Sequence, residues 1–272
     1  MASRFDTLPT SLKKQARPTR LAGVPSLLVH PDWERPAPFV LWMHGRTVDK
    51  ELDPGRYLRW MRAGIGACAI DLPGHGERHE AAADEPSSSL RVMKQALGEV
   101  DAVLDALHAA HPRLFDAARA GIGGMSLGGM ATLRRLCEPH GFSCAAVEST
   151  TGWLGELYNP TLPEPPGRIP PHRHADAEVA PLDPMGHLDG FEPLPLLVLH
   201  SEADRMVPWA GQAAFVAALR KRYEARGADP AMIEVMTWPE TGAPSEHAGF
   251  GKVAGEAKDA QTAFLRRGFG VE

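Results

Sequence analysis

The stretch Gly121-Ile122-Gly123-Gly124-Met125-Ser126-Leu127-Gly128-Gly129-Met130 decides the fold. It predicts a short buried strand, a tight turn with Ser126 at its tip, and a helix that begins behind the turn. Residues 124–128 fit the pattern G-x-S-x-G, in which glycines allow two backbones to approach where side chains would collide. Because such a short pattern also arises by chance, it is informative only if a strand precedes it and a helix follows.

Strands and helices do alternate along the chain on both sides of this stretch. Continuous apolar runs, typical of strands buried on both faces, take turns with segments whose apolar residues recur at spacings of three and four. The predicted strands cover residues 39–43, 66–70, 121–125, 142–147, 194–200 and 232–238, and the predicted helices cover residues 54–61, 90–107, 127–137, 212–223 and 252–267.

This alternation predicts the α/β class, with a doubly wound, mainly parallel sheet and right-handed crossovers. A polar lead-in over residues 1–20 and one or two antiparallel edge strands within residues 21–30 precede it. Asp53 is expected to cap the first long helix, with Pro54 at its first position. We expect residues 1–272 to form a single domain.

One segment interrupts the alternation between Ser149 and Leu194. It has little periodicity, and its prolines include Pro160, Pro163, Pro165, Pro166, Pro170, Pro171, Pro181 and Pro184. A loop of this length in a compact domain is usually a lid or a binding loop, so residues 149–194 predict a short Pro-rich cap inserted in the domain. The alternative is a disordered insertion without a role.

The composition favours a small-molecule partner. The chain of 272 residues is 43% hydrophobic and 23% charged, which is ordinary for a globular protein, and its net charge of −5 includes no long basic run. Nucleic acid and membrane surfaces are therefore disfavoured as partners. No apolar segment resembles a secretory signal or a membrane anchor, which predicts a cytoplasmic protein. Three cysteines without a C-x-x-C pair predict buried free thiols. The sequence indicates no cofactor, and it does not reveal the oligomeric state.

Reactive side chains are expected where strands end, because ligands of open α/β sheets bind at the carboxyl ends of the strands. A serine hydroxyl needs a base to take its proton, and the base needs an acid to orient it. Ser126, Asp204 and His247 follow three predicted strands and can supply these roles. Glu202 and Glu148 remain alternative acids, and His200 and His187 are alternative bases.

Several motifs together resemble the α/β-hydrolase superfamily from about Phe39 to the end of the chain. They are GGMSLGG (123–129), HGR (44–46), DLPGHGER (71–78), LHSEADRMVP (199–208) and EHAGF (246–250). The chain is similar to small bacterial esterases related to dienelactone hydrolase and the catalytic domain of prolyl oligopeptidase. The resemblance implies serine-esterase chemistry through an acyl-enzyme, with Ser126 as nucleophile, Asp204 as acid and His247 as base.

The same resemblance implies where the oxyanion of the reaction is held. One backbone N–H comes from the residue after the nucleophile, Leu127, and one from the loop after an earlier strand, at Arg46. The sequence HGR departs from the HGGG form of many lipases, which implies a simpler oxyanion hole. We also hypothesise that the Arg46 side chain meets a carboxylate on the substrate.

The remaining candidates concern the pocket and a metal. Trp153, Leu157 and Tyr158 could line an acyl pocket or merely pack within the cap. His172 and His174 have a spacing that suggests a metal, but no acidic or cysteine partner stands at motif spacing, so no metal site is predicted. His44, His75 and His79 are expected to brace loops or to be solvated.

These observations predict a metal-independent serine hydrolase that cleaves a small carboxylic ester. A thioesterase or a peptidase using the same three residues is the alternative within the enzymes. A ligand-binding relative that kept the fold without catalysis is the alternative outside them.

Overall fold

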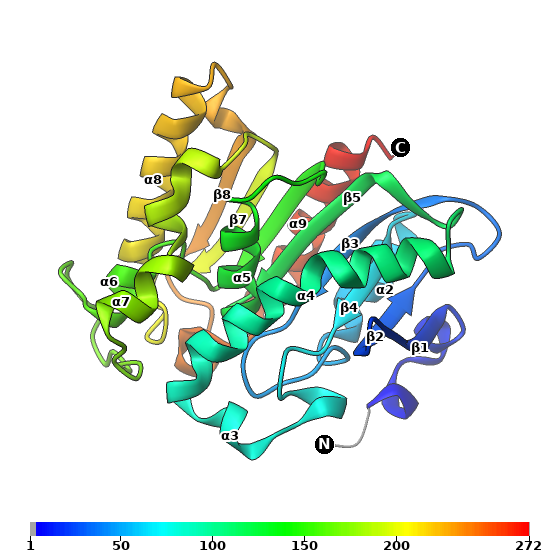
Figure 1. Ribbon diagram of the computed structural model, residues 1–272, viewed down its shortest axis with the longest axis horizontal. Coiled ribbons are helices and arrows are strands. Elements are labelled where there is room, and N and C mark those ends of the chain that lie inside the picture. Colours follow the sequence, from blue (N-terminus) through cyan, green and yellow to red (C-terminus); the bar gives the residue numbers. More distant parts are fainter. Residues whose placement is uncertain (1–3, 272) are drawn as a thin grey trace.

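The computed structural model describes residues 4–271, whose strands form one eight-stranded sheet in the order β1-β2-β4-β3-β5-β6-β7-β8 (Figure 1). β1 and β2 pair antiparallel at one edge and β2 pairs antiparallel with β4, whereas all pairs from β4 to β8 are parallel. The prediction of a mainly parallel α/β sheet is thus confirmed. The strands are β1 Ala16–Leu21, β2 Val24–Val29, β3 Ala37–Met43, β4 Gly66–Ile70, β5 Phe115–Met125, β6 Cys144–Glu148, β7 Leu196–Ser201 and β8 Ile233–Trp238.

Helices cover both faces of the sheet and so enclose two apolar cores. Side chains of α4, α5 and α8 pack with one face, and those of α2 and α9 pack with the other. The helices are α1 Thr10–Lys13, α2 Pro54–Arg62, α3 Ala81–Asp84, α4 Ser89–Ala110, α5 Leu127–Arg135, α6 Leu154–Tyr158, α7 Asp176–Val179, α8 Trp209–Ala225 and α9 Ala254–Phe269. No helix within residues 4–271 is long and apolar enough to cross a membrane.

The strand order creates a crevice at the carboxyl ends of β3 and β5. After β3 the chain turns to one side to form β4 and then returns to form β5 on the other side of β3. Such a reversal leaves a gap between the two outgoing loops, and ligands of open α/β sheets bind there. Met43 of β3 lies beside Gly124 of β5, so the loop that begins at His44 faces the turn at Ser126.

Two details of the amino-terminal third differ from the sequence-based expectation. β1 begins at Ala16 within the predicted lead-in. Only its two end residues, Ala16 and Leu21, are buried, so this edge strand has no apolar run or alternation that would predict it. Asp53 stands at the N-cap position of α2, but its side chain makes no capping hydrogen bond. Its carboxylate instead accepts a hydrogen bond from Arg56 and forms an ion pair with Lys258.

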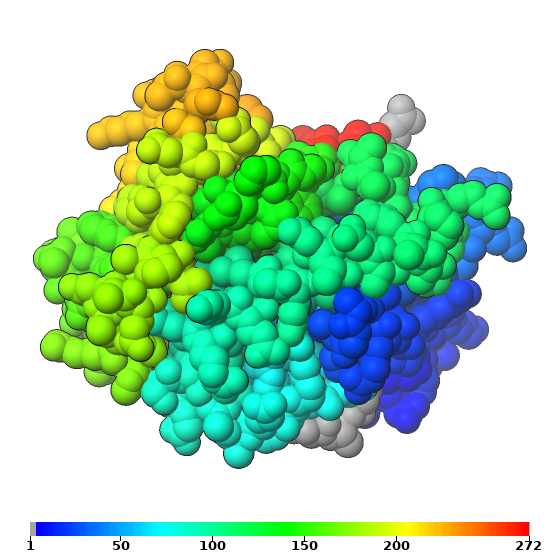
Figure 2. Space-filling model, viewed as in Figure 1, coloured from blue at the N-terminus to red at the C-terminus, as the bar shows by residue number. Residues whose placement is uncertain are grey.

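The Pro-rich segment has regular structure only near its ends. α6 lies at its start, and α7 and short 3-10 turns over residues 180–190 lie at its end, whereas residues 159–175 hold neither helix nor strand. In Figure 2 this part of the chain forms a lobe on the left, against the segment near residues 80–95. The cysteines Cys68, Cys137 and Cys144 are buried and unpaired, as predicted, and burial raises the pKa of each thiol to about 12.

Candidate active site

Ser126 lies on a strained turn between β5 and α5. Its backbone has φ 52° and ψ −119°, a conformation that costs a residue with a side chain on the order of 1–3 kcal/mol. Two glycines allow this turn to form. A Cβ at Gly128 would collide with the carbonyl oxygen of Met43, and a Cβ at Gly124 would collide with the backbone of Gly128. The turn therefore needs glycine at both positions, and it exposes the serine side chain above the sheet.

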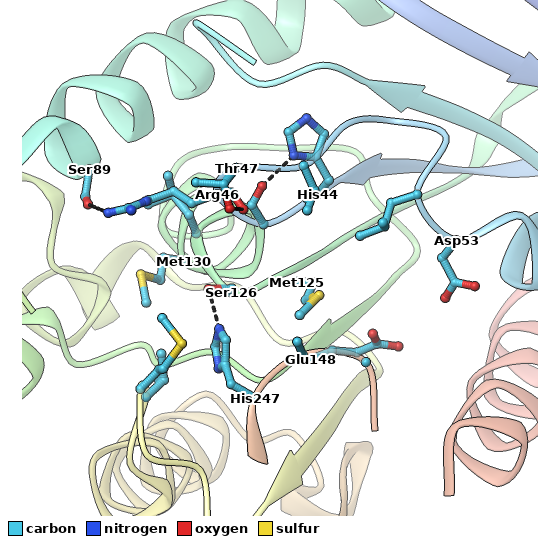
Figure 3. A pocket seen from close by; sticks show the side chains of 18 of the residues that line it. His44, Arg46, Thr47, Asp53, Ser89, Met125, Ser126, Met130, Glu148 and His247 are labelled. Atoms are coloured by element: carbon cyan, nitrogen blue, oxygen red, sulfur yellow. Dashed lines mark hydrogen bonds between the residues drawn. The ribbon is translucent and has the colours of Figure 1, made fainter. Parts of the chain in front are cut away.

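The Ser126 hydroxyl begins a chain of hydrogen bonds that ends on Asp204, and Figure 3 shows its first contact, between Ser126 and His247. Ser126 Oγ lies 3.0 Å from Nε2 of His247, and His247 Nδ1 lies 2.7 Å from Oδ2 of Asp204. Because a carboxylate only accepts, the proton belongs on Nδ1, which leaves Nε2 free to accept from the serine hydroxyl. The other Asp204 oxygen accepts from the backbone amides of Met206 and Val207, both at 2.8 Å. The structure thus brings together the three side chains that the sequence singled out.

The alternative acids are engaged elsewhere. Glu202 accepts a hydrogen bond from the Thr237 hydroxyl at the surface. Glu148 is buried at the end of β6, where both of its oxygens accept from the Arg56 guanidinium at 2.6 and 2.8 Å. Neither carboxylate bonds to His247.

The alternative bases are also accounted for by other contacts. His200 is fully buried and its Nε2 donates to the carbonyl oxygen of Val207 at 2.9 Å, while burial lowers its pKa. His187 bonds through Nδ1 to the carbonyl oxygen of Asp183 at 2.9 Å. Of the histidines considered, only His247 contacts the serine hydroxyl.

Two backbone N–H groups beside Ser126 can receive an oxyanion. Leu127 is the first residue of α5, where helical N–H groups have no partner within the helix. Arg46 follows Gly45, and a Cβ built on Gly45 would lie 3.4 Å from the Cβ of Ser126. Within residues 4–271 neither the Leu127 amide nor the Arg46 amide has a hydrogen-bond partner. The two amides that the sequence predicts as oxyanion donors therefore stay candidates for that role.

His44 braces the loop that carries Arg46. Its Nε2 accepts from the backbone amide of Leu72 at 2.9 Å, so its Nδ1 carries the proton and donates to the carbonyl oxygen of Gly45 at 2.6 Å. Burial lowers the pKa of His44 to about 4, which keeps the ring neutral and this hydrogen-bond pattern intact. His75 is likewise buried, and His79 pairs with a surface carboxylate.

A pocket of about 620 Å³ opens above the serine. This volume is within the range of sites that hold drug-sized molecules. Most of its wall is apolar, and it includes the exposed large apolar side chains found within residues 4–271, namely Leu52, Ile169 and Met206. These three side chains mark the rim as a surface that an apolar ligand would cover.

Only two of the three predicted substrate-binding residues reach this pocket. Leu157 and Tyr158 of α6 line it, together with His172 of the Pro-rich segment. Trp153 does not line it, which corrects the prediction. It stands just before α6 and its partly buried ring packs against the core on the α4–α5 side, so it supports the cap from within.

A buried charged network at one end of the pocket was missed by sequence reasoning. The Arg56 guanidinium lies over the Trp42 ring at 4.1 Å and bonds to Glu148, Gln261 and Asp53. Burial alone would lower the pKa of Arg56, but the Glu148 and Asp53 carboxylates hold it above its ordinary value. The partners are far apart in sequence and form no motif, so no local signal predicted the network.

The two histidines with metal-like spacing do not meet further ligands. The rings of His172 and His174 lie 5.0 Å apart, and the second ring also contacts Tyr158 at 4.9 Å. Within the part of the chain that the structure describes, no group of three or more His, Cys, Asp or Glu side chains could hold a metal ion.

Known proteins include relatives of this chain in sequence and in fold. The chain is similar to esterase YjfP of Escherichia coli strain K12, with 26% identity over 195 residues that cover 69% of this chain and 78% of YjfP. Its fold is similar to that of the Pyrococcus furiosus esterase PF2001, with a TM-score of 0.66, 16% identity and coverage of 96% and 94% of the two chains.

A longer peptidase shares the fold over part of its length. This is a puromycin-hydrolyzing peptidase of Mycobacterium tuberculosis, with a TM-score of 0.71 and 20% identity, matched over 94% of this chain but only 40% of the peptidase. The model of the prolyl oligopeptidase family matches residues 56–269. This match covers most of the chain and includes the strained serine turn and both of its partners. The chain therefore belongs to the prolyl oligopeptidase family of hydrolases.

Proposed function

We propose that the protein is a metal-independent serine esterase that cleaves carboxylic esters through an acyl-enzyme. The observation that carries the proposal is the hydrogen-bonded chain from Ser126 through His247 to Asp204, set on a turn that is strained to expose the serine. An isolated serine is a weak nucleophile, and this arrangement supplies what it lacks.

In the proposed mechanism Ser126 Oγ attacks the carbonyl carbon of the ester while His247 Nε2 takes the hydroxyl proton. Asp204 remains ionised and stabilises the imidazolium that forms. The tetrahedral oxyanion accepts hydrogen bonds from the amides of Leu127 and Arg46. Each such donor stabilises the transition state by roughly 2.7–4 kcal/mol.

The intermediate then collapses, and the ester C–O bond breaks. The leaving alcohol takes the proton from His247 Nε2, and the acyl group stays on Ser126. A water molecule attacks the acyl carbon in the same way and gives its proton to His247. The acid is released, and the serine regains its hydrogen.

Support for esters over peptides comes from the size of the relatives. The esterase YjfP and the P. furiosus esterase are matched over most of their lengths, whereas the M. tuberculosis peptidase is more than twice as long as the part that matches. The structure of residues 149–194 supports a cap role, since Leu157, Tyr158 and His172 of this segment line the pocket. The expectations of a cytoplasmic location and of neither nucleic acid nor membrane as partner remain part of this proposal.

The experiment compares wild type, Ser126→Ala and the control Ser87→Ala, whose serine is exposed on the surface. Each purified protein is assayed with matched p-nitrophenyl esters, thioesters and short peptide anilides. We expect Ser126→Ala to lose ester turnover by a factor of about 10³ or more, with Ser87→Ala equal to wild type. Equal turnover by Ser126→Ala would refute the proposal. Faster turnover of thioesters or peptides than of esters by wild type would establish the corresponding alternative.

A further inference from the structure

The middle of the Pro-rich segment is fastened to the turn that carries Asp204. The backbone amide of Ile169 donates to the carbonyl oxygen of Arg205 at 2.7 Å. The guanidinium of Arg168 donates through Nη1 to the carbonyl oxygens of Arg205 at 3.0 Å and Met206 at 2.7 Å. The Arg168 side chain is only 7% exposed, although most residues around it in the segment are exposed. The buried side chain of Arg168 thus anchors a stretch in which most residues are exposed.

The same turn, residues 205–207, is hydrogen-bonded both to Arg168 and to the Asp204 carboxylate. The amides of Met206 and Val207 donate to Asp204 Oδ1, while the carbonyl oxygens of residues 205 and 206 accept from Arg168. The amide of Arg205 continues the connection, because it donates to the carbonyl oxygen of Ser245 at 3.1 Å, two residues before His247. Hydrogen bonds to and from the main chain of residues 205–207 therefore connect the segment, the acid and the loop of the base.

The positive charge of Arg168 also attracts it to the turn that carries Asp204. Burial lowers the pKa of Arg168, while the Glu164 and Asp204 carboxylates oppose that shift. Glu164 is 41% exposed and lies 3.2 Å from Nε, so solvent screens much of that pair. Asp204 is fully buried, so its attraction to the Arg168 cation is screened much less.

We propose that Arg168 is a positioning residue that couples the Pro-rich segment to the alignment of Asp204 with His247. The segment also contributes Ile169, Pro170, Pro171 and His172 to the pocket wall. A substrate long enough to touch these residues would stabilise the fastened segment and, through Arg168, the aligned acid. Part of its binding energy would then raise kcat instead of lowering KM.

The kinetic test compares Arg168→Met, Arg168→Lys and the control Arg173→Met, which removes an exposed arginine of the same segment. It rests on the proposed esterase function. We expect Arg168→Met to lower kcat for a hexanoate ester roughly 10- to 100-fold, because a small misplacement of a catalytic group has an effect of this size, with KM changed by less than about threefold. Arg168→Lys should recover part of kcat, and Arg173→Met should equal wild type.

A thermal melt separates alignment from general loss of structure. Arg168→Met should lower kcat far more than it lowers the folded fraction at the assay temperature. Arg168→Lys keeps the charge and should recover part of kcat at the same folded fraction. A drop in kcat that matches the loss of folded protein in the melt would overturn the proposal.

Hydrogen–deuterium exchange tests the coupling without any substrate. In Arg168→Met the peptides covering residues 203–208 and 243–249 should exchange faster than in wild type, and in Arg173→Met they should not. Unchanged exchange in Arg168→Met would overturn the proposal. Faster exchange in a protein that hydrolyses no ester would support the coupling while refuting the esterase function, so the two failures are distinguishable.

Discussion

Replacing Glu148 by glutamine should destabilise the protein because it leaves a buried guanidinium without its main counter-charge. Arg56 is 5% exposed and Glu148 is 2% exposed, and their two hydrogen bonds are 2.6 and 2.8 Å long. Removing one partner of a buried ion pair costs about 3–5 kcal/mol. Asp53 remains 3.1 Å from Arg56 and is 28% exposed, which places Glu148→Gln at the lower end, at about 3 kcal/mol.

This cost should be visible in thermal unfolding followed by circular dichroism. For a chain of this size a loss of 1 kcal/mol lowers Tm by about 2–4 °C, so we expect a fall of roughly 6–12 °C. The matched control is Glu234→Gln, which breaks the exposed ion pair between Glu234 and Arg267 and should cost less than about 1 kcal/mol.

A double-mutant cycle identifies the unpaired charge as the cause. Arg56→Met should destabilise wild type strongly, because it leaves the Glu148 carboxylate buried with only Gln261 as a donor. The same change made on top of Glu148→Gln should cost much less, because no unpaired charge is then left behind. The reasoning is refuted if Glu148→Gln lowers Tm no more than Glu234→Gln, or if Arg56→Met costs the same in both backgrounds.

Three further predictions concern the pocket and its loops. The Arg46 guanidinium bonds only to the Ser89 hydroxyl and the Asp84 carbonyl oxygen, and among the described residues it has no carboxylate partner. Arg46→Gln should therefore lower the ratio of kcat/KM for a carboxylate-bearing ester to that for its neutral analogue about 10-fold or more, and an unchanged ratio would remove the hypothesis of an anionic substrate. The pKa of His44, lowered to about 4 by burial, lies below its unfolded value near 6.5, so the folded state binds fewer protons and stability should fall as the pH drops from about 6.5 to 4. His44 should account for on the order of 3 kcal/mol of this loss of stability. When the free energy of unfolding by urea is measured across this pH range, His44→Asn should therefore lose less stability than wild type. An equal loss in the two proteins would contradict the assignment of this pH dependence to His44. The apolar pocket wall predicts that kcat/KM of p-nitrophenyl esters rises from acetate through butyrate to hexanoate, by up to about fourfold per methylene, since a buried CH₂ contributes ~0.8 kcal/mol. A flat or falling series would show that the acyl chain does not bind there.

The parts of the fold that the sequence predicted share one physical origin. Strands such as β3 and β4 are buried on both faces, so their sequences are continuous apolar runs, and the helices show apolar stripes. The serine turn was predictable because it needs glycine at positions 124 and 128, where any Cβ would collide with a neighbouring backbone. Close packing therefore produces local sequence features, such as apolar runs and required glycines, from which the element can be predicted.

Features that depend on partners far apart in the sequence have no local sequence pattern that predicts them. Arg56 stands in a helix with Arg59 and Arg62, and nothing local shows that only Arg56 turns inward to Glu148, which lies 92 residues further along the chain. For Trp153 the sequence left pocket lining and packing within the cap both open, because a helix as short as α6 has no periodicity that shows which side faces the core.

The path of the Pro-rich segment was also closed to sequence reasoning. Its stabilising contacts are hydrogen bonds between single side chains and the main chain, such as those from Arg168 to residues 205 and 206 and those that Glu156 accepts from residues 161 and 162. Such contacts have no period and no composition that would predict them.

The most direct test of the central claim is the mass of a covalent adduct. A fluorophosphonate probe is incubated with wild type and with His247→Ala, and the modified peptide is located by tandem mass spectrometry. The account predicts a stoichiometric adduct on Ser126 in wild type and labelling slowed by a factor of about 10³ or more in His247→Ala. An adduct on another residue, or an intact folded protein that the probe does not modify, would contradict it.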